Sequence, residues 1–167
     1  TEQGWVHLLQ SRWSSSQITV INAAVSGETT DGGLARLPRL LEQHAPTHLY
    51  IELGGNDGLQ GHPVAKMRNN ISQMIHIAKE KDIAVILQQM QIPTNFGRRY
   101  TSMFTAAFSE LGEQHSIPVI PFFLESIALD SNYMQRDGIH PNAAAQPIIA
   151  DTLRMQLEPL IVSSEPQ

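Results

Sequence analysis

Three polar stretches of the chain contain residue types that can do chemistry together. Asp137 stands three residues before His140, and a carboxylate at that spacing can orient an imidazole and fix its tautomer for general-base work. Asn56 follows two glycines, which allow close backbone approach, and its amide can donate to a developing negative charge. The third stretch, residues 22–29, contains a Ser-Gly pair. Taken singly, each stretch is also typical of an ordinary turn or helix cap.

Alternating strands and helices are predicted to position these stretches. Helices are expected from apolar spacing in residues 5–13, 34–41, 63–78, 103–111 and 142–160, with Pro38 kinking or restarting the second of them. Strands are expected at residues 18–21, 48–53, 83–87 and 117–120, with residues 54–58 as a turn after the second strand. This order predicts an α/β fold, a flavodoxin-like parallel sheet within three α/β/α layers, as one domain over residues 1–167. Ligands of such sheets bind at the carboxyl ends of the strands, where the three polar stretches fall.

The composition excludes several classes of protein. The chain is 41% hydrophobic and 16% charged, which are globular values, and no apolar run reaches the length of a membrane span. The net charge of −5 and the absence of a basic stripe argue against a nucleic-acid partner. There is no cysteine, and of the 7 histidines all except His140 are scattered, so we expect no disulfide, no thiolate catalysis and no metal site.

The three stretches, in this order, resemble the SGNH, or GDSL, hydrolase superfamily. The strings are NAAVSGET at residues 22–29, LGGNDG at 53–58 and DGIHPN at 137–142. The likeness is greatest to the bacterial multifunctional thioesterase, lysophospholipase and arylesterase branch. It also includes residues 33–38, 95–100 and 142–147, and so extends over essentially the whole chain.

This resemblance implies roles for individual residues. The catalytic positions that it assigns are Asp137, His140, Gly27 and Asn56. His140 is the implied general base and acid, Asp137 orients it, and Gly27 and Asn56 donate to the oxyanion. The implied substrate-binding residues are Gly55, Ile92 and Pro93. The resemblance further implies a small acyl-ester or thioester substrate, no cofactor, and a periplasmic or secreted protein.

The sequence departs from the family pattern in one respect, because it contains no Gly-Asp-Ser motif. The resemblance begins near Glu2, in the helix that follows that motif, so we expect the nucleophilic serine and the first strand to lie upstream of Thr1. In the family this first strand lies inside the sheet. When the strand is present, the protein is expected to be a monomer. Ser26 has no nucleophile role in the pattern, so residues 1–167 alone are expected to be inactive.

The missing motif is compatible with three origins of the chain and leaves two further functions open. The upstream segment belongs to the natural protein, or is supplied as a separate piece, or is lost in an inactive remnant that folds differently. The alternative function is a non-catalytic acyl or lipid binder on the same scaffold. A third is a flavodoxin-like ligand-binding module, although the chain has no phosphate-cradling glycine loop in the required place.

Overall fold

The computed structural model describes residues 4–13, 17–123, 127, 130–137 and 140–163. The chain forms two compact units. The central unit is Ala23–Phe122, and the terminal unit combines Thr1–Asn22 with Phe123–Gln167. The single domain expected over residues 1–167 stays a prediction.

The central unit is built on a small parallel sheet. Its elements are α2 (Thr30–His44), β1 (His48–Ile51), α3 (Gly55–Leu59), α4 (Val64–Glu80), β2 (Ala84–Gln88), η1 (Thr94–Phe96), α5 (Arg98–His115) and β3 (Val119–Ile120). The strand order is β1-β2-β3, with Tyr50 opposite Ile86 and Leu87 opposite Val119. The apolar run that predicted β2 is buried from Val85 onward, as expected for a middle strand. The strand predicted at residues 117–120 is confirmed as the edge strand β3.

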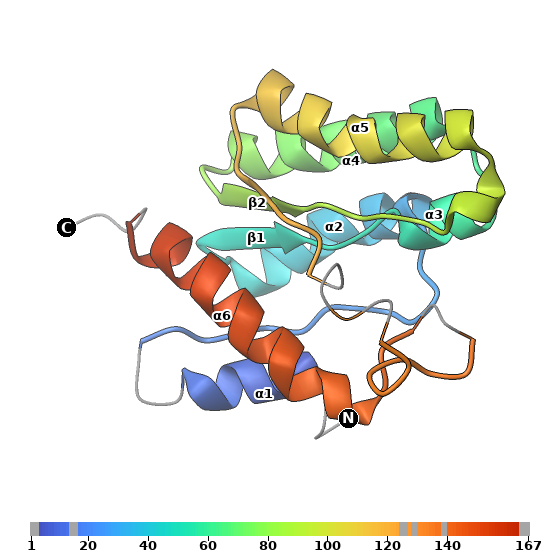
Figure 1. Ribbon diagram of the computed structural model, residues 1–167. Helices are drawn as coiled ribbons and strands as arrows, with labels where there is room; N and C mark the ends of the chain where they lie inside the picture. The colour runs from blue at the N-terminus through green and yellow to red at the C-terminus, as the bar shows by residue number, and fades with distance from the viewer. Residues whose placement is uncertain (1–3, 14–16, 124–126, 128–129, 138–139, 164–167) are drawn as a thin grey trace. The chain divides into compact units, whose positions relative to one another are not determined.

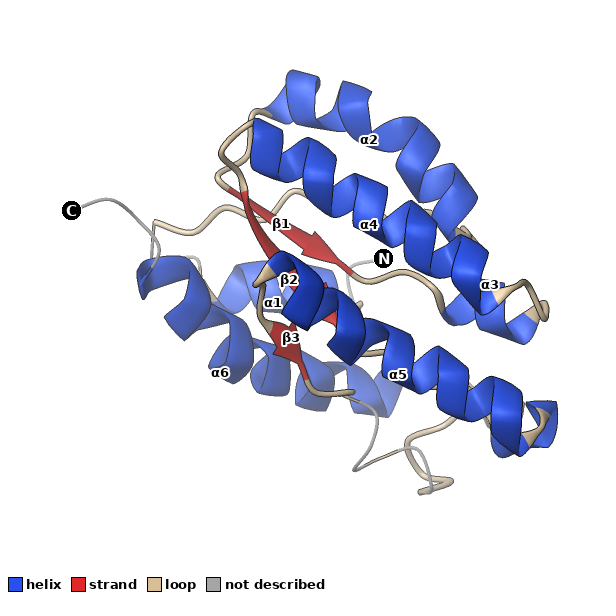
Figure 2. Ribbon diagram, turned by 90° about the horizontal axis from the view of Figure 1, so that it is seen from above, coloured by secondary structure: helices blue, strands red, loops and turns tan. Residues whose placement is uncertain are grey.

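Two helices, α4 and α5, pack against the strands, and α2 packs against α4. In Figure 2 the helices α2, α4 and α5 lie side by side, and α4 packs against both of the others. The apolar positions of α4 and α5 fall at helical spacing because one side of each helix faces the sheet. The largest fully buried side chains of this core include Phe104, Phe108, Ile71, Ile75, Met67, Leu87 and Leu111.

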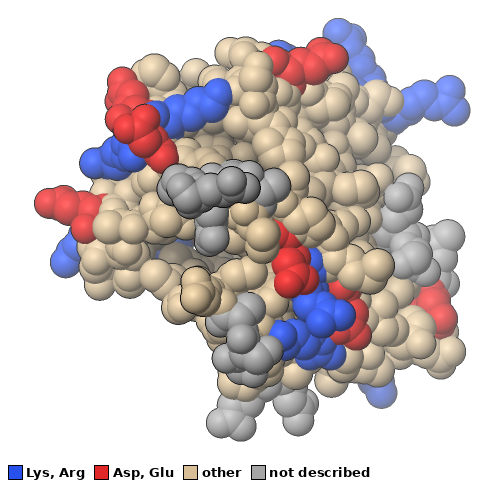
Figure 3. Space-filling view, turned by 90° about the vertical axis from the view of Figure 1, so that its left-hand side faces the viewer, with Lys and Arg blue, Asp and Glu red and all other residues tan. Residues whose placement is uncertain are grey.

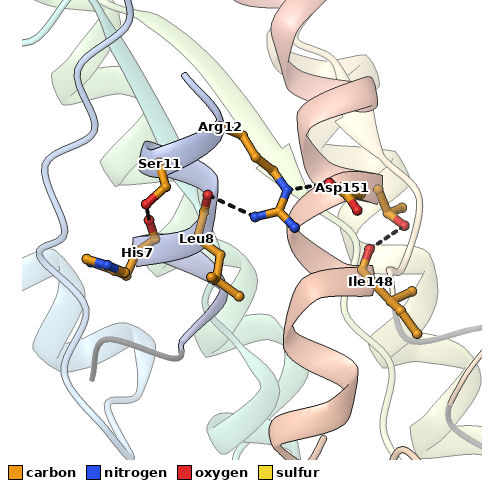
Figure 4. Close-up of polar contacts among 7 residues, drawn as sticks. His7, Leu8, Ser11, Arg12, Ile148 and Asp151 are labelled. Atoms are coloured by element: carbon orange, nitrogen blue, oxygen red, sulfur yellow. Dashed lines mark hydrogen bonds and ion pairs between the residues drawn. The ribbon is translucent and has the colours of Figure 1, made fainter. Parts of the chain in front are cut away.

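The terminal unit is a pair of packed helices with an irregular segment. Its elements are α1 (Trp5–Arg12), η2 (Ala143–Ala145) and α6 (Gln146–Ser163), and Figure 1 shows α1 alongside α6. The backbone N–H of Trp5 donates to Gln146 Oε1 over 2.9 Å. Figure 4 shows Arg12 of α1 reaching across to form an ion pair with Asp151 of α6. The helices predicted at both ends of the chain are therefore confirmed.

Two predicted elements are wrong. Residues 18–21 form no strand: the carbonyl of Ile18 accepts from Gln10 Nε2 over 3.2 Å and the N–H of Val20 donates to Gln10 Oε1, so a side chain of α1 replaces a neighbouring strand as their partner. Residues 54–58 were expected to form a turn, but Gly55–Leu59 form the short helix α3.

The helix α2 runs through Pro38, so it does not restart at that residue. The α/β class with a parallel sheet is confirmed. The three-layer arrangement stays a prediction, because α1 and α6 belong to the terminal unit.

Charges of both signs are interspersed on the surface that Figure 3 shows. Within the described ranges, no helix combines the length and the apolar character that crossing a membrane requires.

Candidate active site

Gly27 lies at the tip of a tight turn in the loop before α2. The N–H of Glu28 donates to the carbonyl of Val25 over 3.2 Å, and Gly27 has φ of +76°. A positive φ at the third position of such a turn favours glycine over residues with a Cβ. Gly27 is exposed, and no residue of the described ranges accepts a hydrogen bond from its N–H. The turn therefore presents an unused backbone donor.

Asn56 extends its amide toward the same loop. It lies in the first turn of α3, behind Gly54, whose φ of +109° redirects the chain at the end of β1. A Cβ at Gly54 would lie 3.0 Å from both Met67 Sδ and Phe108 Cζ, so the turn has no room for a side chain. Asn56 Nδ2 donates to the carbonyl of Glu28 over 3.2 Å. One proton of the amide is thus engaged, which fixes the direction of the other.

A buried carboxylate ties α3 to the start of α2. Asp57 is 2% exposed, and its two oxygens accept from Thr30, over 2.8 Å from the backbone N–H and 2.6 Å from the hydroxyl. The side chain of the N-cap residue Thr29 makes no capping bond, so a residue 27 positions along the chain satisfies the first helical N–H. Asn70 of α4 donates to Thr30 Oγ1 over 3.0 Å. This network holds the helix ends that position Gly27 and Asn56.

Asp137 and His140 form a directly bonded pair in the terminal unit. His140 Nδ1 lies 2.7 Å from Asp137 Oδ2, and the His140 backbone N–H donates to Asp137 Oδ1 over 3.0 Å. A carboxylate on Nδ1 favours the tautomer in which Nε2 carries the lone pair. The His140 side chain is 60% exposed. The pair therefore has the geometry of a general base oriented by an acid.

Backbone hydrogen bonds hold the loop around this pair. Gln135 N–H donates to the His140 carbonyl over 2.7 Å, and Met134 forms a β-bridge with Pro141. Asn142 donates its side-chain amide to the carbonyl of Asn132 over 2.7 Å and accepts from Ala145 N–H at the start of η2. The irregular segment thus fixes His140 without regular secondary structure.

The three expected substrate-binding residues differ in their surroundings. Gly55 lies under Met90, whose Cε would be 3.3 Å from a Cβ added at that glycine. Ile92 is 7% exposed and belongs to the hydrophobic core of the central unit. Pro93 is exposed. Met90 is half-buried and adds an apolar side chain beside Gly55 that the resemblance did not assign.

Two titratable groups lie on the segment that leads to Asn56, namely Tyr50 in β1 and Glu52 just after the strand ends. Burial raises the pKa of Glu52 to about 7, because the ionised carboxylate loses its hydration. Burial also raises the pKa of Tyr50, with a contribution from the charge of Glu52, and the Tyr50 hydroxyl donates to Gln88 Oε1 over 2.6 Å. Glu52 is therefore a group that changes charge near neutral pH.

The structure brings the predicted site residues together in two pairs. Gly27 and Asn56 lie within the central unit, and Asp137 and His140 lie within the terminal unit. Sequence reasoning missed the residues that hold the first pair, namely Thr30, Asp57, Glu28 and Arg36. Their contacts join separate elements, and no spacing rule signals them.

Comparisons with known proteins identify the family. Residues 1–147 match the model of the GDSL-like Lipase/Acylhydrolase family. The chain is 43% identical, over 94% of its length and 75% of the relative's, to "Thioesterase 1/protease 1/lysophospholipase L1" of Escherichia coli (strain K12). It is 41% identical to "Arylesterase" of Vibrio mimicus, over 93% of this chain and 79% of that protein.

A solved structure agrees with these relatives. The esterase EstA from a Pseudoalteromonas species, in a crystal structure inhibited by monoethylphosphonate, matches with a TM-score of 0.93 and 42% identity. The match covers 96% of this chain and 88% of that one. The resemblance drawn from the three polar stretches is thereby confirmed. The chain belongs to the GDSL-like lipase/acylhydrolase family of ester-bond hydrolases.

Proposed function

We propose that the protein hydrolyses small acyl esters and thioesters, including lysophospholipids, by Ser-His-Asp acyl transfer. The observation that carries this proposal is the bond of 2.7 Å between His140 Nδ1 and Asp137 Oδ2. The nucleophile is the serine of a Gly-Asp-Ser segment upstream of Thr1. The printed names of the relatives, which include thioesterase, lysophospholipase and arylesterase, support this choice of substrates.

In the proposed reaction, Nε2 of His140 takes the proton of the serine hydroxyl as its oxygen attacks the acyl carbon. The carbonyl oxygen becomes an oxyanion, which accepts hydrogen bonds from the Gly27 N–H, the Asn56 amide and the serine N–H. Collapse of this intermediate expels the alkoxide or thiolate, which takes the proton from His140. Water then repeats the sequence on the acyl-enzyme and releases the carboxylic acid.

The acyl chain is proposed to lie along the loop after β2. Gly55 and Pro93 contact the acyl group in this proposal, and Ile92 supports the loop from below. The half-buried Met90 over Gly55 supports an apolar groove next to the oxyanion donors, as expected for an acyl-chain site. We also propose that the full-length protein is a monomer and that it acts in the periplasm or outside the cell.

The test is the turnover of p-nitrophenyl esters by the full-length protein, which is the chain together with its proposed upstream Gly-Asp-Ser segment. Asp137→Asn should lower kcat by about 10⁴-fold, because an amide on Nδ1 favours the wrong tautomer. Ser26→Ala is the matched control, since Ser26 is exposed beside Gly27 and should leave kcat unchanged. Parent-like turnover of the Asp137→Asn variant refutes the assignment. Loss of turnover in the Ser26→Ala variant would identify a different nucleophile, and binding of acyl esters without turnover would favour the acyl-binding alternative.

A further inference from the structure

We propose that Glu28 and Arg36 are positioning residues that hold the two oxyanion donors, Gly27 and Asn56, in a fixed relation to one another. This inference rests on the proposed function, because it gives the donors their role. Neither residue touches the reacting atoms in the proposal. Both act through the loop of residues 23–29.

Arg36 holds the loop before α2 at both of its ends. From the second turn of α2, its Nε donates to Glu28 Oε2 over 2.8 Å and its Nη2 donates to Glu28 Oε1 over 2.9 Å. The same Nη2 donates to the carbonyl of Ala23 over 2.7 Å. A guanidinium can make this fork-shaped contact, whereas an ammonium cannot. One side chain thereby bridges residue 23 and residue 28, with the turn that carries Gly27 between them.

We call these hydrogen bonds from Arg36 the clamp, and Glu28 connects the clamp to both donors. Its backbone N–H closes the turn by donating to Val25, which sets the position of Gly27. Its backbone carbonyl accepts from Asn56 Nδ2, which sets the direction of the amide. The carboxylate of the same residue is the part that Arg36 holds. A displacement of Glu28 would therefore move both donors at once.

The local packing is shaped for this carboxylate. The Glu28 side chain is only 11% exposed and lies against α2. A Cβ at Gly32 would lie 3.0 Å from Glu28 Cγ and 3.1 Å from Oε2, so the glycine leaves the space that Glu28 occupies. The hydrogen bond to Glu28 also raises the pKa of Arg36, as expected for a close ion pair.

The loop itself contributes little to the core. Residues 24–27 are exposed, and neither Glu28 nor Arg36 belongs to the hydrophobic core. Their loss should therefore affect the geometry of the donors more than global stability. The oxyanion is absent from the bound substrate and forms only in the tetrahedral intermediate and the transition states on either side of it. Displaced donors therefore lower kcat and leave KM nearly unchanged.

The kinetic test uses the full-length protein with p-nitrophenyl butyrate. Arg36→Ala should lower kcat by about 10- to 100-fold, which is less than the loss of about 10²–10³ typical of removing a whole donor, with KM changed by less than about twofold. Arg36→Lys should recover little, because the fork is lost. Arg39→Ala is the matched control: it removes the same charge from an exposed position of the same helix and should keep the parent kcat.

A double variant separates positioning from independent effects. If Glu28 acts through Asn56, the loss in Glu28→Gln combined with Asn56→Ala should be smaller than the product of the two single losses. If the loss of kcat in the double variant equals the product of the two single losses, the inference is overturned. The inference is also overturned if the thermal midpoint of the variants falls so far that unfolding explains their loss of activity.

A second readout does not depend on activity. In ¹⁵N–¹H spectra of the full-length protein, the Gly27 N–H and the Asn56 side-chain amide should shift in Arg36→Ala and in Glu28→Gln, and not in Arg39→Ala. Unshifted resonances would refute the positioning role. If the parent protein turns over no ester while these resonances shift as expected, the proposed function fails and the structural coupling stands.

Discussion

Replacement of the buried Asp57 by asparagine tests the network that fixes the helix ends at the site. The substitution keeps the shape of the side chain and creates no cavity, so its effect isolates hydrogen bonding. Asp57 accepts two hydrogen bonds from Thr30, and Thr30 is 0% exposed. The amide of the variant has one acceptor oxygen instead of two.

The expected cost follows from the partners of Thr30. The Thr30 hydroxyl oxygen already accepts from Asn70 Nδ2 over 3.0 Å. In the variant the proton of this hydroxyl has no acceptor and no access to water. A buried unsatisfied donor costs about 1–3 kcal/mol, and the bond to the backbone N–H loses the strength of a charged acceptor. We expect Asp57→Asn to lower the free energy of unfolding by about 3 kcal/mol.

Urea unfolding of the full-length protein, followed by far-UV circular dichroism, measures this change. Tryptophan fluorescence is less suitable, because Trp5 and Trp13 both lie in the terminal unit. Glu42→Gln makes the same chemical change at an exposed position of α2 and should stay within about 0.5 kcal/mol of the parent. In a Thr30→Val background the cost of Asp57→Asn should fall to about 1 kcal/mol. An equal cost in both backgrounds would refute the reasoning.

Three further predictions concern the surroundings of the site. Folding raises the pKa of Glu52 from 4.5 to about 7. The contribution of Glu52 to the free energy of unfolding is therefore most favourable below pH 4.5 and is lost as the pH rises to 7. Glu52→Gln should therefore stabilise the protein at pH 8, by up to roughly 3 kcal/mol, and much less at pH 5, as measured by urea unfolding at both values. Gly58→Ala should destabilise by about 1–3 kcal/mol, because its Cβ would lie 2.7 Å from Ile92 Cγ2 and 2.8 Å from Phe104 Cε2; an unchanged thermal midpoint contradicts this packing. Met90→Lys should raise KM for long acyl esters by about tenfold and leave KM for acetyl esters nearly unchanged, and equal effects on both chain lengths would exclude Met90 from the acyl groove.

The sequence predicted best those elements whose pattern is local. The apolar run of β2 and the helical spacing of α4 need no knowledge of distant residues, and both elements occur where expected. Residues 18–21 have the composition of a strand, but pairing decides whether a strand forms. The short helix α3 was missed because Gly and Asn favour turns, and because Asp57 finds its partner in a distant helix.

The candidate site divides in the same way. Asp137 and His140 are close in sequence, so their spacing allowed a bonded pair to be predicted, although the same spacing is also typical of a turn. The amide of Asn56 was also recognised from the sequence as a possible donor, whereas the role of Gly27 came from the family resemblance. The clamp of Arg36 on Glu28 joins a helix to a loop eight positions earlier, and it required the three-dimensional structure.

The bond from Thr30 N–H to Asp57 has a consequence for hydrogen exchange. Amides in the first turn of a helix ordinarily exchange quickly with solvent, because they have no partner within the helix and the helix end frays. The Thr30 amide donates instead to a carboxylate that is itself 2% exposed. Its exchange therefore requires α2 and α3 to separate, and its rate should resemble that of an amide in the middle of α2. The protection of this one amide reports how often the loop that carries Gly27 loses its support.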